Sequence, residues 1–472
     1  MHSTDENNIT QWISAHEEIF IETLSRFVSI PSVVRIGEKG LPYGQACSDA
    51  LAFISEEMAE IKLGIDNVDK HVVIGTMAGS GGKKHIGIAL HADVVPPEGT
   101  WDKDPFTLWR CGDWLVGRGV TDNKGPGIAV LFALRYLFEH NIKLRNKLSL
   151  YFGSAEEAGM DDMDYLKTQR PMPDFALVPD AGFPVCNGEK GCIRFKASIS
   201  IKDSNLIDFH AGVNGNSVAA EAEASVRYGN TDVLRVLNNF EGISASCSGG
   251  IVRISSAGRA RHTAFPDEGI DAIGRLARAL DAADILEGPA KKAVRFIGRS
   301  TSDFHGAGLG ISMEDDVSGK LTHVLPLIRA GDDYITIMYN IRYPISADPE
   351  RLEERIHSRI CGEGFRIYDF VLSPACYTPV TPLINGLCRI ANTIMETEDT
   401  PYTMGGSTYA RKFPRAVAYG MGVPSRMLQP PFPAGQGRAH QPNESVYLPR
   451  LLKGIHIYIK AILAADKHLE EE

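Results

Sequence analysis

The residues with the clearest chemical potential stand at the end of a short apolar stretch, residues 86–90, which is followed by His91 and Asp93. The apolar run predicts a buried strand, and in open α/β sheets ligands bind outside the carboxyl ends of the strands. His91 and Asp93 are two residues apart, so an extended backbone would direct both side chains to one face. This predicts half of a metal site, with His91 as ligand and Asp93 as the residue that orients it. Two unrelated polar residues at a strand end are the simpler alternative.

Two further predicted strands also end in carboxylates. Residues 147–152 are followed by Glu156 and Glu157, and residues 175–179 by Asp180. Strands that alternate with helices indicate a largely parallel sheet, whose carboxyl edge gathers residues that are distant in the sequence. We therefore expect these side chains to lie near His91.

A glycine-rich loop adds Asp122 just before a predicted helix, where it could also be a simple helix cap. Sets of imidazoles and carboxylates without thiolates suit zinc, cobalt or manganese. The candidate ligands are His91, Asp122, Glu157, Asp180 and His440. Five ligands are one more than a single tetrahedral zinc needs, and they fit two ions about 3.5–4 Å apart if one carboxylate bridges them. Glu156 remains beside a ligand, as a general base would be.

The pattern of apolar and polar residues changes from about residue 188. Residues 192–201 and 219–226 alternate with period two, which is typical of antiparallel strands with one solvated face. A weak repeat is also visible, because Arg227-Tyr228 and Arg342-Tyr343 each precede a helix-like segment. We expect a domain at residues 189–381, inserted between the two parts of an α/β domain at residues 1–188 and 382–472. Chance similarity of the two repeated segments is the alternative.

The composition of the chain and its missing motifs argue against several classes of function. The chain has 472 residues and a net charge of −10, which argues against nucleic acid or an anionic membrane as partner. No run of about 18 apolar residues is present, and the eight cysteines are scattered, so we expect a cytoplasmic protein with free thiols. The sequence also lacks Gly-Xaa-Ser-Xaa-Gly and His-Glu-Xaa-Xaa-His, the signatures of serine hydrolases and zincins.

Motifs along nearly the whole chain resemble those of the dinuclear zinc peptidases of the ArgE/DapE/aminoacylase/carnosinase family, above all the PepV-type dipeptidases. The matching segments include His91-Ala-Asp-Val-Val-Pro, Gly117-Arg-Gly-Val-Thr-Asp-Asn-Lys-Gly-Pro, Glu156-Glu157, Pro179-Asp180, Gly258-Arg-Ala-Arg-His, Gly405-Gly-Ser-Thr-Tyr-Ala-Arg and His440-Gln-Pro-Asn-Glu. The resemblance implies a three-layer α/β catalytic domain with a mixed, mostly parallel sheet. It also implies an inserted α+β lid domain built of two related ferredoxin-like halves.

The resemblance implies a role for each matching metal ligand. Asp122 would bridge two zinc ions, for which manganese or cobalt could substitute. His91 and Asp180 would hold one ion, and Glu157 and His440 the other.

The same resemblance implies the catalytic and substrate-binding residues. Asp93 would orient His91, Glu156 would be the general base for a hydroxide between the ions, and His262 on the lid would stabilise the oxyanion. The residues expected to contact substrate are Asn216, Arg342, Gly405, Gly406 and Arg411. Three departures from the family pattern, Asn123, Ser407 and Ala219, concern substrate fit more than metal binding.

The expected function is hydrolysis of dipeptides with a free amine and a free C-terminal carboxylate. An N-acyl-amino-acid deacylase or carboxypeptidase with the same metal site is the alternative, and a non-catalytic binding protein on this scaffold is a more remote one. In relatives with a short lid, the partner subunit supplies the oxyanion histidine. Because the insertion here is about twice as long, we expect His262 to serve its own chain and the protein to be a monomer.

Overall fold

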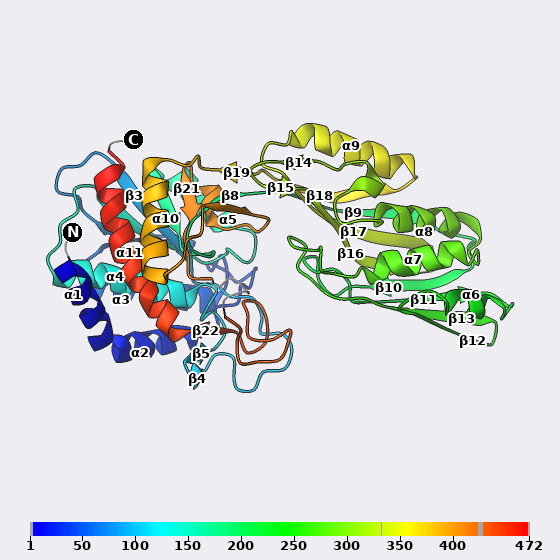
Figure 1. The fold of residues 1–472 in the computed structure, drawn as a ribbon, viewed down its shortest axis with the longest axis horizontal. Coiled ribbons are helices and arrows are strands. Elements are labelled where there is room, and N and C mark those ends of the chain that lie inside the picture. Colours follow the sequence, from blue (N-terminus) through cyan, green and yellow to red (C-terminus); the bar gives the residue numbers. More distant parts are fainter. Residues whose placement is uncertain (1–2, 332, 423–427, 471–472) are drawn as a thin grey trace. The chain divides into compact units, whose positions relative to one another are not determined.

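A computed structural model describes residues 3–331, 333–422 and 428–470 (Figure 1). The chain forms two compact units. Unit 1 comprises residues 1–187, 378–402 and 407–472, and unit 2 comprises residues 188–377 and 403–406. The sequence placed the divisions after residues 188 and 381, and it did not anticipate that residues 403–406 belong to unit 2.

Unit 1 is built on a mixed sheet with the strand order β1-β2-β6-β3-β7-β21-β8. The strands are β1 Gly64–Val68, β2 Val72–Met77, β3 His85–His91, β6 Lys147–Gly153, β7 Phe175–Val178, β8 Cys186–Glu189 and β21 Ala416–Ala418. The pairs β6–β3, β3–β7 and β7–β21 are parallel, whereas β1–β2, β2–β6 and β21–β8 are antiparallel. Parallel pairing at the centre brings the carboxyl ends of β3, β6 and β7 to one edge, as the sequence predicted.

The helices of unit 1 surround this sheet (Figure 1). They are α1 Ser3–Ala15, α2 Glu17–Val28, α3 Gln45–Glu60, α4 Lys124–Glu139, α5 Asp161–Gln169, α10 Pro382–Met395 and α11 Leu448–His468. One large core holds side chains of α2, α3, α4, α10 and α11, and a separate core on the other face holds side chains of α5. In β3, Ile88 and Leu90 enter the first core and Ala89 the second. Because a strand alternates its side chains between faces, this places helices on both sides of the sheet and gives three layers.

Smaller strands complete unit 1. The strands β4 Trp109–Cys111, β5 Trp114–Val116 and β22 Ser445–Tyr447 form a separate sheet. The strand β19 Cys376–Tyr377, which belongs to unit 2, and the strand β20 Tyr402–Met404, which begins in unit 1 and ends in unit 2, both pair with β8. Helices α1 and α2 are separated by a break at His16, whose ring Nδ1 lies 2.8 Å from the carbonyl oxygen of Trp12.

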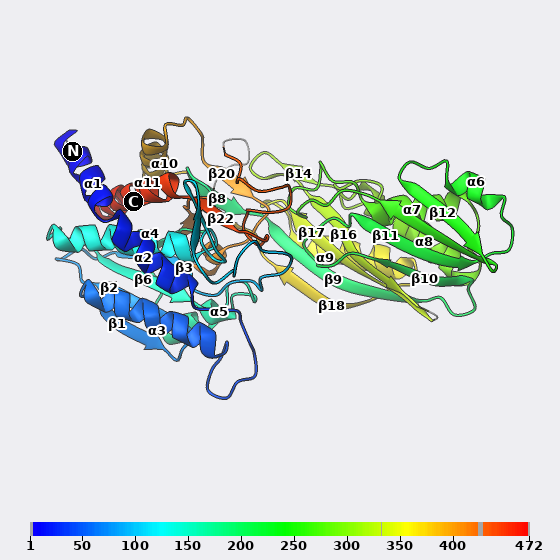
Figure 2. The same cartoon turned by 90° about the horizontal axis from the view of Figure 1, so that it is seen from below.

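Unit 2 contains an eight-stranded antiparallel sheet in the order β12-β13-β11-β10-β16-β17-β9-β18 (Figure 2). The strands are β9 Gly191–Ser200, β10 Leu206–Ala211, β11 Glu221–Arg227, β12 Ile243–Ser248, β13 Ile251–Ala257, β16 Thr322–Ala330, β17 Tyr334–Tyr343 and β18 Arg366–Ser373. A short hairpin pairs β14 Glu314–Asp315 with β15 Gly319–Lys320.

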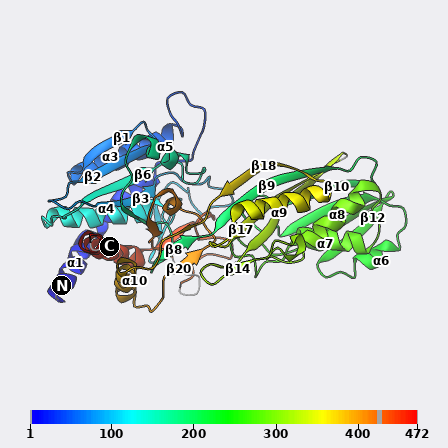
Figure 3. The ribbon, with the colours of Figure 1, turned by 90° about the horizontal axis from the view of Figure 1, so that it is seen from above.

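Helices pack on one face of this sheet (Figure 3). They are α6 Val233–Leu237, α7 Ala272–Ala282, α8 Gly288–Ser300 and α9 Pro349–Gly362. The side chains that meet them from β17 include Ile337, Tyr339 and Ile341. Residues at the alternate positions of β17, such as Asn340 and Arg342, therefore face away from the helices.

The strand order of unit 2 shows two related halves. Strands β10 and β16 pair antiparallel at the centre, and each is followed by its hairpin partner, β11 or β17, and then by α6 or α9. Arg227 ends β11 and Arg342 lies at the end of β17, so the repeated Arg-Tyr segments occupy equivalent places. The α+β insertion of two ferredoxin-like halves is confirmed, and the helix-like segment that follows Tyr228 contains the short helix α6.

No helix within the described ranges combines the length and the apolarity needed to cross a bilayer.

Candidate metal centre

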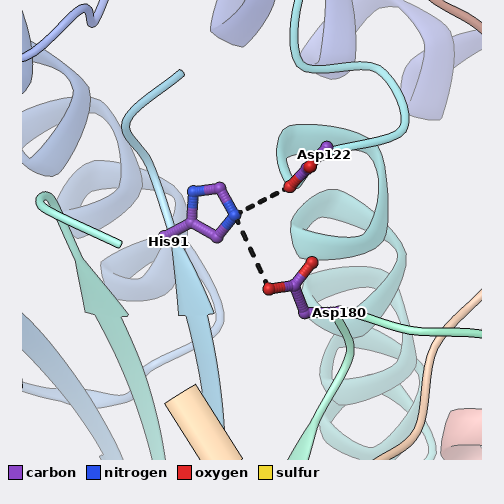
Figure 4. Close-up of side chains that lie close together, drawn as sticks. All are labelled: His91, Asp122 and Asp180. Atoms are coloured by element: carbon purple, nitrogen blue, oxygen red, sulfur yellow. Dashed lines mark hydrogen bonds and ion pairs between the residues drawn. The ribbon is translucent and has the colours of Figure 1, made fainter. Parts of the chain in front are cut away.

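His91, Asp122 and Asp180 lie together at the carboxyl edge of the unit 1 sheet (Figure 4). His91 ends β3, Asp180 follows β7, and Asp122 precedes α4. The Nε2 atom of His91 lies 3.0 Å from Oδ1 of Asp122 and 3.9 Å from Oδ2 of Asp180. His91 is completely buried. The predicted convergence of a histidine and two carboxylates from separate strands and a loop is thus present.

A second group shares Asp122 with the first. The Nε2 atom of His440 lies 2.9 Å from Oε1 of Glu157 and 3.0 Å from Oδ2 of Asp122. The two oxygens of Asp122 therefore face two different histidines, His91 and His440. In each group the ligand atoms lie within 4.8 Å of one another, which is a spacing that a single ion can bridge. This arrangement fits two metal ions with a shared carboxylate.

The electrostatics of the cluster also fit bound cations. Burial raises the pKa of Glu157, and the neighbouring charge of Asp122 raises it further. Burial alone would lower the pKa of His440, but hydrogen bonds with Asp122 and Glu157 raise it to about 11. Several carboxylates lie close together here, so positive charge is strongly favoured. The oxygen and nitrogen donors, with no thiolate, suit zinc, cobalt or manganese.

Glu156 is buried beside the same cluster. Its pKa is raised well above the usual range, first by burial and then by the charge of Asp180. A carboxyl group with a raised pKa holds a proton more readily, which suits a general base. Glu156 also forms a third group with His91 and Glu157 whose ligand atoms lie within 4.8 Å, so geometry alone would also allow it to be a ligand.

Asp93 makes more contacts than the sequence suggested. The Nδ1 atom of His91 lies 2.9 Å from the backbone oxygen of Asp93 and 3.4 Å from its Oδ1. The nearest partner of the imidazole is therefore a carbonyl, because β3 ends at His91. The Asp93 carboxylate accepts hydrogen bonds from the backbone N–H groups of Glu156 (3.1 Å) and Glu157 (3.0 Å). Asp93 thus links the turn of Glu156 and Glu157 to the His91 segment.

Asp162 holds the preceding part of the same turn. Its Oδ2 accepts hydrogen bonds from the backbone N–H groups of Ser154 (2.8 Å) and Ala155 (3.0 Å), and from the hydroxyl of Tyr409. Four successive N–H groups, those of residues 154–157, therefore bond to two buried carboxylates. A Cβ atom on Gly153 would lie 2.3 Å from Oδ2 of Asp162, so only glycine fits there. Nothing in the sequence indicated this role for Asp162.

Glu444 similarly supports the Asp122 loop. Its carboxylate accepts hydrogen bonds from the backbone N–H groups of Gly119, Thr121 and Asp122, and from the guanidinium of Arg118 at 2.7 Å. Arg118 and Glu444 are both fully buried. Both residues belong to motifs quoted above, but nothing in the sequence indicated that they contact each other.

Asn123, one of the departures from the family pattern, contacts a candidate ligand. Its Nδ2 donates to the backbone oxygen of Pro179 at 2.7 Å and to Oδ1 of Asp180 at 3.3 Å. A carboxylate in that place could not donate to either oxygen. Asn123 therefore supports the position of Asp180.

Unit 2 brings its own predicted residues close together. Ser217 and His262 form a β-bridge, and the N–H of Thr263 donates to the backbone oxygen of Asn216 at 2.9 Å. The hydroxyl of Thr322 donates to the backbone oxygen of Thr263, and Thr322 lies opposite Arg342 in the β16–β17 pair. Asn216, His262 and Arg342 are thus linked through neighbouring loops and strands.

The ring of His262 is held in a defined state. Its Nδ1 accepts a hydrogen bond from the backbone N–H of Ala264 at 3.2 Å. A neutral imidazole that accepts at Nδ1 carries its proton on Nε2. The residue itself is exposed.

The predicted glycine and arginine loop is divided between the units. Gly405 and Gly406 belong to unit 2, where a Cβ atom on Gly405 would lie 2.9 Å from Cβ of Ala264. Arg411 belongs to unit 1, in the 3-10 turn Tyr409–Lys412.

A three-layer α/β unit whose sheet edge gathers imidazoles and carboxylates is suited to a metal-dependent enzyme. The chain belongs to Peptidase family M20/M25/M40, whose model matches residues 87–464. It is therefore a metallopeptidase, and the family resemblance seen in the sequence is confirmed.

Individual relatives are distant. A Staphylococcus aureus (strain MRSA252) protein, whose name describes it provisionally as a dipeptidase, is 29% identical over 473 residues, with 95% of this chain and 97% of the relative covered. The solved dipeptidase Dug1p from Saccharomyces cerevisiae has a TM-score of 0.60 at 15% identity, with 98% of each chain covered. A metallo-carboxypeptidase of the M20 family from Sulfolobus solfataricus has a TM-score of 0.57 at 16% identity, covering 95% and 99%. At these identities the two structures establish the shared fold alone.

Proposed function

We propose that the protein is a dipeptidase with two metal ions, which cleaves short peptides that have a free amine and a free C-terminal carboxylate. The observation that carries the proposal is the position of Asp122, whose two oxygens face His91 and His440 at 3.0 Å each. A carboxylate shared by two ligand groups is what a dinuclear site requires.

In this proposal His91 and Asp180 hold one ion, Glu157 and His440 hold the other, and Asp122 serves both. Zinc is the expected metal, with manganese or cobalt as substitutes, because the donors are imidazole nitrogens and carboxylate oxygens. The bound ions would polarise the scissile carbonyl and lower the pKa of water.

Glu156 would be the general base. It would take a proton from the attacking water and give it to the leaving amine, which is the usual exchange for a carboxyl group of raised pKa. Its burial supports this role, since few competing waters reach a buried carboxylate.

We assign substrate contacts to unit 2, acting as the lid, and to Arg411 of unit 1. The Nε2–H of His262 would donate to the carbonyl oxygen as negative charge develops there. Arg342 and Arg411 would bind the C-terminal carboxylate, because a guanidinium donates two parallel hydrogen bonds to a carboxylate. Asn216, Gly405 and Gly406 complete the set of proposed contacts.

The dipeptidase assignment is supported by the name of the Staphylococcus aureus relative, which aligns over 95% of this chain. Deacylase or carboxypeptidase activity is the second candidate, since a metallo-carboxypeptidase shares the fold. The choice depends on which groups meet the amine end of the substrate.

A substrate panel tests the proposal. The zinc-loaded protein should hydrolyse dipeptides at least about tenfold faster than N-acetyl amino acids and N-blocked dipeptides, measured as kcat/KM. Glu156→Gln should retain its metal and lose roughly a hundredfold or more in kcat. Preference for the N-acetyl substrates would make the protein a deacylase, and a fully active Glu156→Gln variant would remove Glu156 from its role. Loss of metal from that variant would make Glu156 a ligand.

A further inference from the structure

A buried asparagine that the sequence did not single out contacts a proposed substrate residue. Asn340 on β17 has no exposed surface, and its Nδ2 donates to the backbone oxygen of Gly215 at 2.9 Å and to Oδ1 of Asn216 at 3.1 Å. Its Oδ1 lies 3.9 Å from the thiol sulfur of Cys192, within reach of a weak S–H donor. Both ends of the Asn340 amide thus have partners.

The chemistry of these partners fixes which atom is which. A backbone carbonyl only accepts hydrogen bonds, so the Asn340 atom beside the oxygen of Gly215 has to be the nitrogen. That nitrogen also faces the side chain of Asn216, where a second nitrogen would place two donors against each other. The Asn216 atom beside Asn340 is therefore the carbonyl oxygen. The backbone carbonyl of Gly215 thus determines the orientation of the Asn340 amide, and the Asn340 amide determines the orientation of the Asn216 amide.

The backbone of Asn216 is also held by hydrogen bonds. Its backbone N–H donates to Oδ1 of Asn214 at 3.0 Å, and its backbone oxygen accepts from Thr263. Asn216 is nevertheless an exposed residue. With its side-chain oxygen committed to Asn340, the amide presents Nδ2, which is a donor.

We infer that Asn340 is a positioning residue that orients Asn216 as a hydrogen-bond donor, and that the ligand at this point of unit 2 must offer an oxygen acceptor. The inference rests on the proposed function, in which Asn216 contacts the substrate. A dipeptide offers two such acceptors, its C-terminal carboxylate and its peptide carbonyl. Polar groups that only donate, such as an ammonium group, would be rejected here.

The test is a double-mutant cycle with Asn340→Asp and Asn216→Ala. Aspartate has nearly the size of asparagine, but its carboxylate would repel the oxygen of Gly215 and turn the Asn216 amide to present its oxygen instead. Each single variant should lower kcat/KM for a dipeptide about tenfold or more, with metal content unchanged. In the Asn216→Ala background, Asn340→Asp should cost less than about threefold, because its effect passes through Asn216.

Fully additive losses would overturn the inference, because Asn340 would then act independently of Asn216. An Asn216→Ala variant with normal kcat/KM would also overturn it, whereas the proposed function would stand as long as Glu156→Gln is inactive. If Asn340→Asp does not fold, Asn340→Ser keeps one donor for Gly215 and should give the same non-additive pattern with smaller losses.

A matched control separates positioning from general damage to unit 2. Asn205 also donates from its side-chain amide to backbone oxygens, those of Arg227 (3.2 Å) and Ile285 (2.7 Å). Asn205→Asp should lower the melting temperature without changing KM, and an equal rise in KM for both variants would contradict a specific role for Asn340. Repeating the cycle on the C-terminal amide of the same dipeptide identifies the acceptor. Loss of the Asn216→Ala effect assigns it to the carboxylate, and persistence of the effect assigns it to the peptide carbonyl.

Discussion

The carboxylate of Glu444 accepts a hydrogen bond from the backbone N–H of Asp122 at 3.1 Å. Glu444 follows His440 by four residues, so the segment that carries one candidate ligand also supports the loop of another. Two more N–H groups of that loop, those of Gly119 and Thr121, bond to the same carboxylate. The position of Asp122 is therefore coupled to that of His440.

Glu444→Gln should weaken metal binding. An amide nitrogen would face N–H groups that now meet a carboxylate oxygen, and loss of such supporting contacts typically lowers metal affinity about 10- to 100-fold. The measurement is metal retained during titration with a chelator. Arg118→Met is the control, because it breaks the same buried ion pair and leaves the acceptors for the loop in place. Both variants should unfold more easily, by roughly 3–5 kcal/mol, but only Glu444→Gln should lose metal affinity. Equal metal affinity in the two variants would contradict this.

Asp122→Ala should lose both ions at once. Because each oxygen of Asp122 faces a different histidine, removal of the carboxylate takes a ligand from both groups. Elemental analysis after dialysis should give fewer than about one ion per chain, against about two in the unaltered protein. Retention of two ions would place the shared ligand elsewhere.

Amidation of the substrate C-terminus should raise KM about tenfold or more, since guanidinium groups bind a carboxylate more strongly than a neutral amide. Amidation should raise KM less in the Arg342→Met or the Arg411→Met variant, depending on which of the two residues binds the carboxylate. An unchanged KM for the amide with the unaltered enzyme would rule out carboxylate binding as the main anchor.

His262→Ala should reduce kcat about a hundredfold or more, because it would remove the donor proposed for the developing oxyanion. Metal content should be normal. Mixing this variant with Glu156→Gln should restore no activity if each chain uses its own His262, as the two related halves of unit 2 suggest for a monomer. Recovered activity would show that His262 is exchanged between subunits.

The stability of unit 2 should fall in weak acid because of His323. This residue is fully buried against the ring of Tyr339, with 5.1 Å between ring centroids. Burial lowers its pKa to about 4, despite the opposing charge of Asp303. An unfolded histidine titrates near 6.5, so the unfolded state binds more protons between pH 6.5 and 4. The contribution is complete above pH 6.5 and is lost as the pH falls towards 4.

Between pH 7.5 and pH 5, His323 alone should account for a loss of about 2 kcal/mol of unfolding free energy. Urea unfolding at the two pH values measures it, and His323→Phe should reduce the difference by that amount. His85 and His456, whose pKa values are also lowered to about 4, contribute equally to both proteins and cancel in the comparison. The same pH dependence in His323→Phe would show that another group is responsible.

The sequence by itself determined which residues could form the metal centre. The apolar strands that precede His91 and Asp180 can be recognised from short stretches of sequence, because strand periodicity and the geometry of parallel sheets are local rules. His440 and Asp122 do not end predicted strands. They were identified by their residue types and by the motifs in which they lie. The two-halved insertion was also visible, in the repeated Arg-Tyr segments.

Only the tertiary structure decided how these residues are held. Asp162 bonds to Tyr409 across 247 positions, and Glu444 bonds to Asp122 across 322. The pair of Asn340 and Asn216 spans 124 positions. A buried carboxylate or amide is stable only where packing supplies its partners, and a partner that is remote in the chain leaves no periodic signal in the sequence. The motifs therefore predicted the candidate ligands, whereas long-range packing selected the groups that orient them.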